Sequence, residues 1–175
     1  MLQTAVQALK EGREPELDRP LAAATEVNLH MPALLPESYI GDVQTRLTLY
    51  KRIAAAPDTG TLEELQTEIG DRFGELPPAA HTLLHTARLS LACRTLGLRR
   101  LDVSAQYAHV TFAEQNRVDP AVVIGLIQRE PRMFRLEGSL KLRVARGAPE
   151  AERVAFALKL LERLGATRAR DGSNQ

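Results

Sequence analysis

Three carboxylates at helical spacing are the side chains of this chain best placed to do chemistry. Glu64, Glu68 and Asp71 recur every three or four positions, so a helix would place them on one face. We expect an acidic ridge with no intervening lysine, which could bind a basic partner. The alternative interpretation is an ordinary solvated helix face.

The same segment contains the apolar side chains needed to position that ridge. A capping box of Thr61 and Glu64 predicts where the helix begins, and Gly74 predicts where it ends. Within the segment, apolar residues at helical spacing predict a buried stripe on the face opposite the carboxylates. The residues of this stripe are Leu62, Leu65, Ile69 and Phe73.

Hydrophobic periodicity predicts the remaining elements. We expect strands at 25–31, 98–103, 107–112, 132–136 and 139–144, and helices at 42–56, 78–96, 120–130 and 151–164. The fold class is therefore α+β: an N-terminal helical block followed by two strand–strand–helix units, which form a small, mainly antiparallel sheet packed with helices. We expect residues 2–10 to form a short helix, 11–20 a linker and 166–175 a flexible tail.

Periodicity also predicts which side of each helix faces the core. The expected inward residues are Val43, Leu47, Tyr50 and Ala54 in the first helix, Leu83, Leu84, Ala87 and Leu91 in the third, Val123, Ile124 and Ile127 in the fourth, and Ala151, Val154, Leu158 and Leu161 in the last.

Composition bounds the class of protein. The net charge of +1 hides an asymmetry: residues 1–85 carry 7 basic and 13 acidic side chains, whereas 86–175 carry 16 and 9. This polarity favours oriented docking. The single cysteine, Cys93, excludes an internal disulfide, suits a reducing cytoplasm and is expected to be a buried, inert thiol. We find neither a signal peptide nor a membrane-spanning run, and expect a cytoplasmic protein without membrane contacts.

Motifs for catalysis and cofactor binding are weak. We find neither a Walker-type phosphate loop nor a Gly-x-Gly-x-x-Gly pattern. His81 and His85 have the i, i+4 spacing of a zinc pair, but residue 82 is Thr, and we expect polar residues at the edge of an apolar stripe. A hydrolase that uses carboxylates or this histidine pair is the least favoured interpretation.

Nucleic-acid binding through the basic second half is a stronger alternative. Aromatic residues are sparse, so no platform for stacking bases is evident, but phosphate neutralisation needs only basic side chains. The residues that could supply them are Arg88, Arg94, Arg99, Arg100, Arg129, Arg132, Arg135, Lys141, Arg143 and Arg146.

Several sequence runs together resemble one known family. They are residues 26–32 (EVNLHMP), 35–40 (LPESYI), 42–47 (DVQTRL), 50–53 (YKRI) and 71–77 (DRFGELP), with Leu96-Gly97 and Phe112-Ala113-Glu114 further along. Over about residues 1–145, this combination resembles the C-terminal domain of bacterial transcription-repair coupling factors. The last helix and the tail match more weakly.

The resemblance implies a non-catalytic, autoinhibitory domain. Full-length relatives are ATP-driven translocases on duplex DNA that displace stalled RNA polymerase and recruit the UvrA damage-recognition protein. Their C-terminal domain docks on the N-terminal, UvrB-like module of the same protein, masks UvrA binding and restrains the motor. The motor motifs and their ATP site lie in preceding domains, so we expect no cofactor in this chain. Residues 1–24 would be the end of the translocase module and a linker, followed by the regulatory domain at 25–165.

The resemblance also implies which residues contact the partner. Glu68 and Asp71 occupy the positions of the family's acidic contact pair, and arginines of the UvrB-like module are their expected partners. Glu64 extends the ridge without support from the family. Arg72 flanks the pair and is included among the partner-binding residues, although its first expected role is structural. The remaining alternative is a module that binds DNA or RNA polymerase through the basic half.

Overall fold

The computed structural model describes the backbone of residues 25–171 and the side chains of residues 25–165. This part of the chain contains five α-helices and a five-stranded sheet, which confirms the α+β prediction. Its residues fall into two compact units: 32–87 form a helical unit, and 25–31 with the segment from residue 88 onward form a sheet unit. The helix and linker expected at 2–10 and 11–20 lie outside the described residues.

Aspartates begin the first two helices of the helical unit. Helix α2 spans Val43–Ala55, and the carboxylate of Asp42 accepts the backbone N–H of Thr45. Helix α3 spans Thr59–Phe73, and Asp58 accepts the N–H of Thr61 at 2.8 Å. The capping-box prediction was therefore wrong: the N-cap of α3 is Asp58 rather than Thr61, three residues earlier, and an aspartate is a strong N-cap.

The core of the helical unit confirms the stripe of α3 and corrects that of α2. Leu62, Leu65 and Ile69 are buried, and Phe73 is half-buried. On α2, however, Val43 and Ala54 are exposed, and the buried side chains are Leu49, Tyr50 and Ile53. The Tyr50 hydroxyl accepts the N–H of Leu35 at 2.8 Å, which ties the preceding loop to this face.

Helix α4, Pro78–Leu96, was predicted with the correct bounds. Leu83 and Leu84 are buried as expected, whereas Ala87 and Leu91 are only half-buried. The segment of α4 from residue 88 belongs to the sheet unit, where Cys93 is fully buried. Burial raises the pKa of this thiol to about 12, in agreement with the inert role expected for it.

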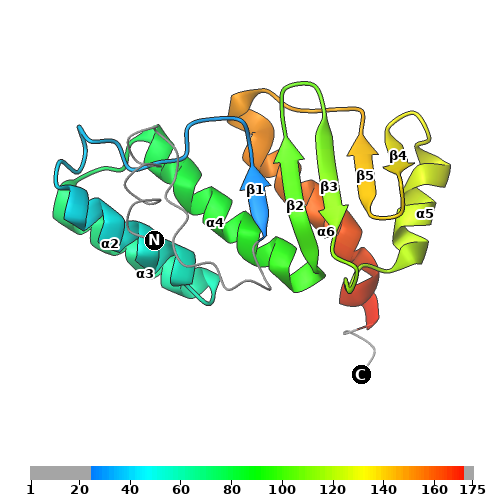
Figure 1. The fold of residues 1–175 in the computed structure, drawn as a ribbon, viewed down its shortest axis with the longest axis horizontal. Coiled ribbons are helices and arrows are strands. Elements are labelled where there is room, and N and C mark those ends of the chain that lie inside the picture. The colour runs from blue at the N-terminus through cyan, green and yellow to red at the C-terminus, as the bar shows by residue number, and fades with distance from the viewer. Residues whose placement is uncertain (1–24, 172–175) are drawn as a thin grey trace. The chain divides into compact units, whose positions relative to one another are not determined.

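The sheet has the strand order β1-β2-β3-β5-β4 (Figure 1). Its strands are β1 (Glu26–Asn28), β2 (Leu98–Val103), β3 (Ala108–Phe112), β4 (Phe134–Glu137) and β5 (Lys141–Val144). Only β1 pairs in parallel, with β2, and the other three pairings are antiparallel. The sheet is therefore mainly antiparallel, as predicted, with one parallel edge strand.

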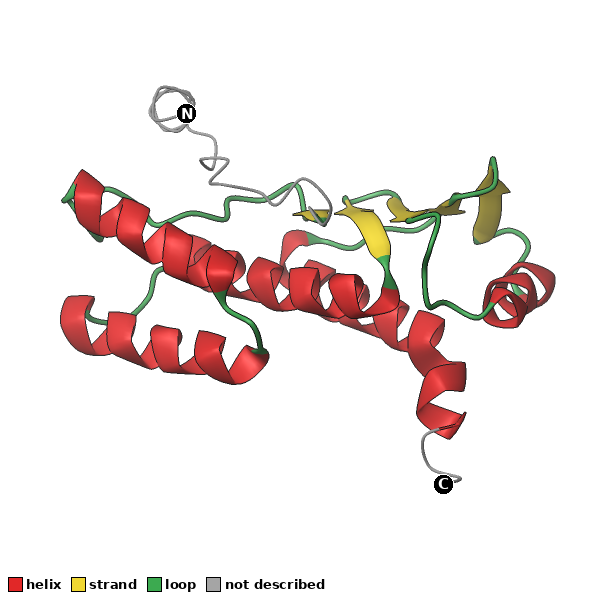
Figure 2. Ribbon diagram, turned by 60° about the horizontal axis from the view of Figure 1, so that its bottom comes forward, coloured by secondary structure: helices red, strands yellow, loops and turns green. Residues whose placement is uncertain are grey.

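Two strand–strand–helix units build the rest of the sheet unit. Strands β2 and β3 lead into α5 (Pro120–Arg129), and β4 and β5 lead through a short 3-10 turn (Glu150–Glu152) into α6 (Arg153–Asp171). Figure 2 shows α5 and α6 on one side of the strands. The core between these layers includes Leu101, Val110 and Leu142, all fully buried.

The inward faces of α5 and α6 differ from the prediction. Ile124 and Leu158 are exposed, and so is Ala151. Val123 and Leu161 are buried as predicted, and the other buried residues of these two helices are Leu126, Arg153, Ala157, Leu160 and Leu164. The backbone of α6 also continues seven residues beyond the predicted end, to Asp171. None of the helices in the described part of the chain is long and apolar enough to span a membrane.

Candidate partner-binding surface

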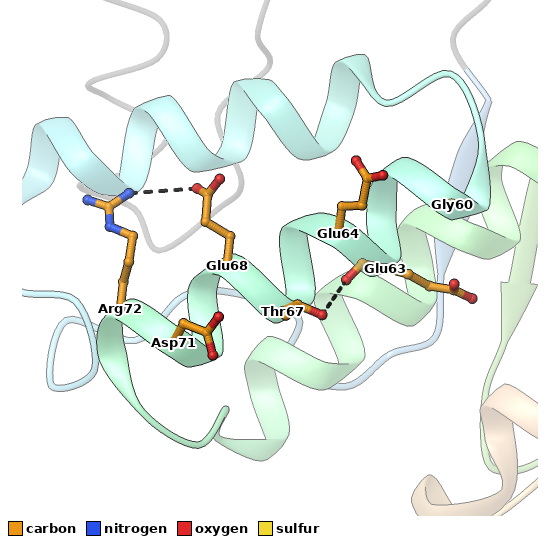
Figure 3. A pocket seen from close by; sticks show the side chains of 7 residues that line it. All are labelled: Gly60, Glu63, Glu64, Thr67, Glu68, Asp71 and Arg72. Atoms are coloured by element: carbon orange, nitrogen blue, oxygen red, sulfur yellow. Dashed lines mark hydrogen bonds and ion pairs between the residues drawn. The ribbon is translucent and has the colours of Figure 1, made fainter.

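Burial of one side of α3 turns its charged side outward. Between the buried Leu62, Leu65 and Ile69, the helix presents two rows of side chains with a spacing of four residues. One row is Glu64, Glu68 and Arg72, and the other is Glu63, Thr67 and Asp71. Figure 3 shows the two rows on different sides of the helix axis.

These two rows line a shallow groove of about 630 Å³, which we call the acidic groove (Figure 3). Its lining residues are Gly60, Glu63, Glu64, Thr67, Glu68, Asp71 and Arg72. The structure therefore brings together all four residues that the sequence analysis selected. It adds Glu63, which was not predicted from the sequence although it precedes Asp71 by eight residues, close to two helical turns.

The central carboxylate of the groove is paired within the domain. The two terminal guanidinium nitrogens of Arg52, on α2, donate to Glu68: Nη2 donates to Oε1 at 2.9 Å, and Nη1 donates to Oε2. Arg72 approaches the same carboxylate at 3.8 Å. Hydrogen bonding to Arg52 holds the pKa of Glu68 below its ordinary value. The ridge has no intervening lysine, as expected, but at Glu68 an arginine from the neighbouring helix lies beside it.

The other carboxylates of the groove face solvent. Glu63, Glu64 and Asp71 are exposed, and within residues 25–165 their side chains make neither an ion pair nor a side-chain hydrogen bond. Four carboxylates and one guanidinium line the groove, so the described lining has a net negative charge. The uncompensated part of that charge comes from the residues that flank Glu68.

Arg72 ends the groove at the C-terminal turn of α3, next to Phe73. The Arg72 guanidinium carbon lies 4.8 Å from the centre of the Phe73 ring, in a cation–π contact. The edge of Tyr39 meets the same ring, and the Tyr39 hydroxyl donates to the carbonyl of Gly74 at 2.6 Å. These contacts agree with the structural role expected first for Arg72, and its contact with a partner stays a prediction.

Three of the basic residues of the second half are paired with carboxylates on the outer face of the sheet. On the outer face of the sheet, Arg100 donates to Asp102 at 2.6 Å and also contacts Glu26. Lys141 and Arg143 on β5 both lie within 4 Å of the Glu137 carboxylate. The pairing reduces the positive potential that a nucleic acid would meet there.

The histidine pair on α4 lacks a third metal ligand. His81 and His85 are both half-buried, and residues 25–165 contain no cluster of three or more histidine, cysteine, aspartate or glutamate side chains arranged to hold a metal ion. Structural zinc sites use four protein ligands and catalytic sites three. The described geometry gives a zinc site no support.

The sequence also matches known proteins. The model of the TRCF domain family matches residues 29–123. The chain is 48% identical over 143 residues to the transcription-repair-coupling factor of Escherichia coli strain K12, covering 82% of this chain and 12% of that protein. It is 40% identical over 167 residues to that of Haemophilus influenzae strain Rd, covering 95% and 15%.

A solved structure has the same fold. The crystal structure of the C-terminal domain of a transcription-repair coupling factor superposes with a TM-score of 0.62 at 22% identity, covering 82% of this chain and 96% of that one. The chain thus spans about an eighth of the length of the coupling factors above and nearly all of this single domain. From the family match and the shared fold, we conclude that the chain belongs to the TRCF domain family of transcription-repair coupling factors.

Proposed function

We propose that this domain is the autoinhibitory lid of a transcription-repair coupling factor. In this proposal the acidic groove docks on the N-terminal, UvrB-like module of the same protein. The docked lid masks the surface that binds UvrA and restrains the translocase, which acts on duplex DNA and RNA polymerase. The domain itself is non-catalytic, and ATP binds in the motor domains of the full-length protein.

The uncompensated carboxylates of the acidic groove are the observation that carries this proposal. Glu64 and Asp71 are exposed at the rim of a single groove, and Glu63 adds a third charge. Carboxylates of this kind suit the fork of an arginine, which can donate two parallel hydrogen bonds. A partner surface with arginines facing α3 could therefore form ion pairs with carboxylates that are not paired within the described part of the domain.

The strength required of such a lid is small. An exposed ion pair contributes about 0.2–1 kcal/mol, so a few pairs give only a weak contact. A covalent tether raises the effective concentration of the lid to about the millimolar range. A contact with a dissociation constant of about 10 μM would then be closed about 99% of the time, and opening it would cost about 2.7 kcal/mol.

The test is a charge reversal in the full-length protein. We choose Glu64→Arg with Asp71→Arg and leave Glu68 unchanged, since reversing it would also strand Arg52. The control is Glu162→Arg, which reverses a single exposed carboxylate on α6 in the sheet unit. The lid account predicts that the double variant binds UvrA and translocates on DNA without the resting restraint, whereas the control stays at the resting level.

Two outcomes would overturn the proposal. One is a correctly folded double variant in which UvrA binding and motor activity both stay at their resting level. The other is an equal release by the Glu162→Arg control, because a general loss of negative charge would then explain the result. Binding to duplex DNA, the competing function, predicts a steep loss of affinity with added salt for the isolated domain.

A further inference from the structure

The ion pair between Arg52 and Glu68 has a geometry that the docking proposal does not use. Arg52 lies on α2, Glu68 lies on α3, and the two side chains meet fork to fork with a nitrogen on each carboxylate oxygen. Both remain well exposed, with 44% and 37% of their side-chain surface accessible. A partner that enters the acidic groove therefore meets the guanidinium together with the carboxylate.

Arg52 lowers the net charge of the groove. The lining has four carboxylates and the single guanidinium of Arg72, a net charge of −3. Arg52 is not part of the lining, but it donates to one of these carboxylates and brings the local sum to −2. Glu68, with Arg52 and Arg72 beside it, is the carboxylate with the least negative surroundings.

We propose that Arg52 is an internal counter-ion that weakens the docking of an arginine-bearing surface on the acidic groove. This inference rests on the proposed function, because it concerns the strength of the same contact. Glu64 and Asp71 attract the partner, while Arg52 cancels the charge of Glu68 and repels incoming cations. Arg52 thereby keeps the contact weak enough for a competitor to open it.

The size of the effect follows from Coulomb's law. A unit charge about 7 Å from the incoming guanidinium, at the dielectric constant of water, changes the binding constant about threefold. Arg52 occupies one acceptor site on each oxygen of Glu68, and a carboxylate has about four such sites, so Arg52 acts on a partner through its charge rather than by blocking Glu68. Because the groove is open to solvent, the effect should almost vanish at 1 M salt, where the screening length is about 3 Å.

A double-mutant cycle tests this role. The 175-residue chain is titrated with the separately purified N-terminal module of its parent protein at low salt. We expect Arg52→Gln to bind about threefold more tightly, Glu68→Gln about threefold more weakly, and the double variant like wild type. Lys51→Gln is the matched control: it removes the same charge from the adjacent exposed residue of α2 and should change the affinity less.

Other patterns in the cycle contradict the proposal. If Arg52 served to position Glu68 for the partner, Arg52→Gln would weaken binding. If the partner depended on hydrogen bonds to Glu68, the double variant would bind as weakly as Glu68→Gln alone. Thermal unfolding of each variant separates these results from loss of fold.

Failure of the docking proposal gives a different pattern. If the chain with Glu64→Arg and Asp71→Arg binds the module as well as wild type does, the groove is not the docking surface and both proposals fail. If that variant loses binding while Arg52→Gln leaves it unchanged, docking stands and only the counter-ion role of Arg52 is overturned.

Discussion

The acidic groove on α3 and the outer face of the sheet are both charged and open to solvent, but their charges are arranged differently. On the sheet, Asp102 lies between Arg100 and His30, and Glu137 contacts two basic residues of β5. On α3, only Glu68 has cationic neighbours, and Glu64 and Asp71 have none among the described side chains.

The difference separates charges that stabilise a fold from charges left available to a partner. Cross-strand pairs of opposite charge stabilise a sheet, and Glu26 faces Arg100 and Glu137 faces Lys141 in register. A row of like charges on a helix instead destabilises it slightly. The groove therefore contains charge that the domain does not need for its own stability.

Among the substitutions considered, the largest expected loss of stability is at Arg153, a buried residue of α6 in the sheet unit. Its buried guanidinium donates to the carbonyl oxygens of Ala148, Leu29 and His30, at 2.8, 3.3 and 3.1 Å. Arg153→Gln should lower the free energy of unfolding by about 3 kcal/mol, because buried carbonyls lose their donors. Chemical denaturation measures this loss, and faster labelling of the buried Cys93 would locate it in the sheet unit.

Arg163→Gln on the same helix is the control for Arg153. Arg163 pairs with Glu130 at the surface, so its loss should cost less than about 1 kcal/mol. If both variants lost the same free energy of unfolding, the burial of Arg153 would not account for its contribution to stability.

The next largest loss of stability is expected at Asp102, and comparing it with Asp71 tests whether the sheet's charges stabilise the fold while those of the acidic groove do not. Asp102, with 12% of its side chain exposed, accepts two hydrogen bonds from Arg100. Asp102→Asn should cost about 1–2 kcal/mol, since the paired cation loses its acceptor. Asp71→Asn should stay within about 0.5 kcal/mol of wild type. A large loss for Asp71→Asn in urea denaturation would mean that the groove is structural after all.

Gly70 gives a stabilising change within the helix that carries the groove. A methyl group at this position would meet only the end of the Leu76 side chain, at 3.6 Å, an ordinary contact. Gly70→Ala should stabilise the helical unit by about 0.5–1 kcal/mol, because alanine loses less backbone freedom in a helix. The docking affinity should not change. Destabilisation in thermal denaturation would show a close approach that the structure does not contain.

The smallest effects are on the pH dependence, and they too differ between the units. Hydrogen bonding to Arg52 lowers the pKa of Glu68, so its contribution to stability is present above its ordinary value of 4.5 and is lost as the pH falls through the folded value. Burial lowers the pKa of His109 on β3, so its contribution begins to fall below pH 6.5. The midpoint of thermal unfolding should therefore depend less on pH than in wild type, below pH 4.5 in Glu68→Gln and below pH 6.5 in His109→Gln. A midpoint that depends more steeply on pH in either variant would contradict these assignments.

The elements of this fold could be predicted from the sequence because their signals are local. The stripe of α3 repeats without ambiguity, and strand β5 alternates between buried leucine or valine and outward basic residues. The inward faces of α5 and α6 could not be fixed in the same way. Apolar residues adjoin one another there, as at Leu160 and Leu161, so more than one helical phase satisfies the pattern.

Long-range pairings explain the rest of the differences. Arg52 is 16 residues from Glu68 and on another helix, so the periodicity of α3 alone could not reveal that the ridge has a counter-ion. Arg153 is 123 residues from His30, and its burial follows only from the packing of α6 on the sheet. The four residues predicted to bind a partner could be selected together because helical spacing places them on the outer side of α3, but their charge balance required the tertiary structure.

The most direct test of the account is the affinity of the 175-residue chain for the N-terminal module of its parent protein, with one charge reversal on each surface. We expect Asp71→Arg, in the acidic groove, to weaken binding by about tenfold, since an attraction becomes a repulsion. Arg135→Glu, on the outer face of the sheet, should leave the affinity unchanged. Loss of binding by Arg135→Glu with full binding by Asp71→Arg would contradict the account and move the docking surface to the sheet.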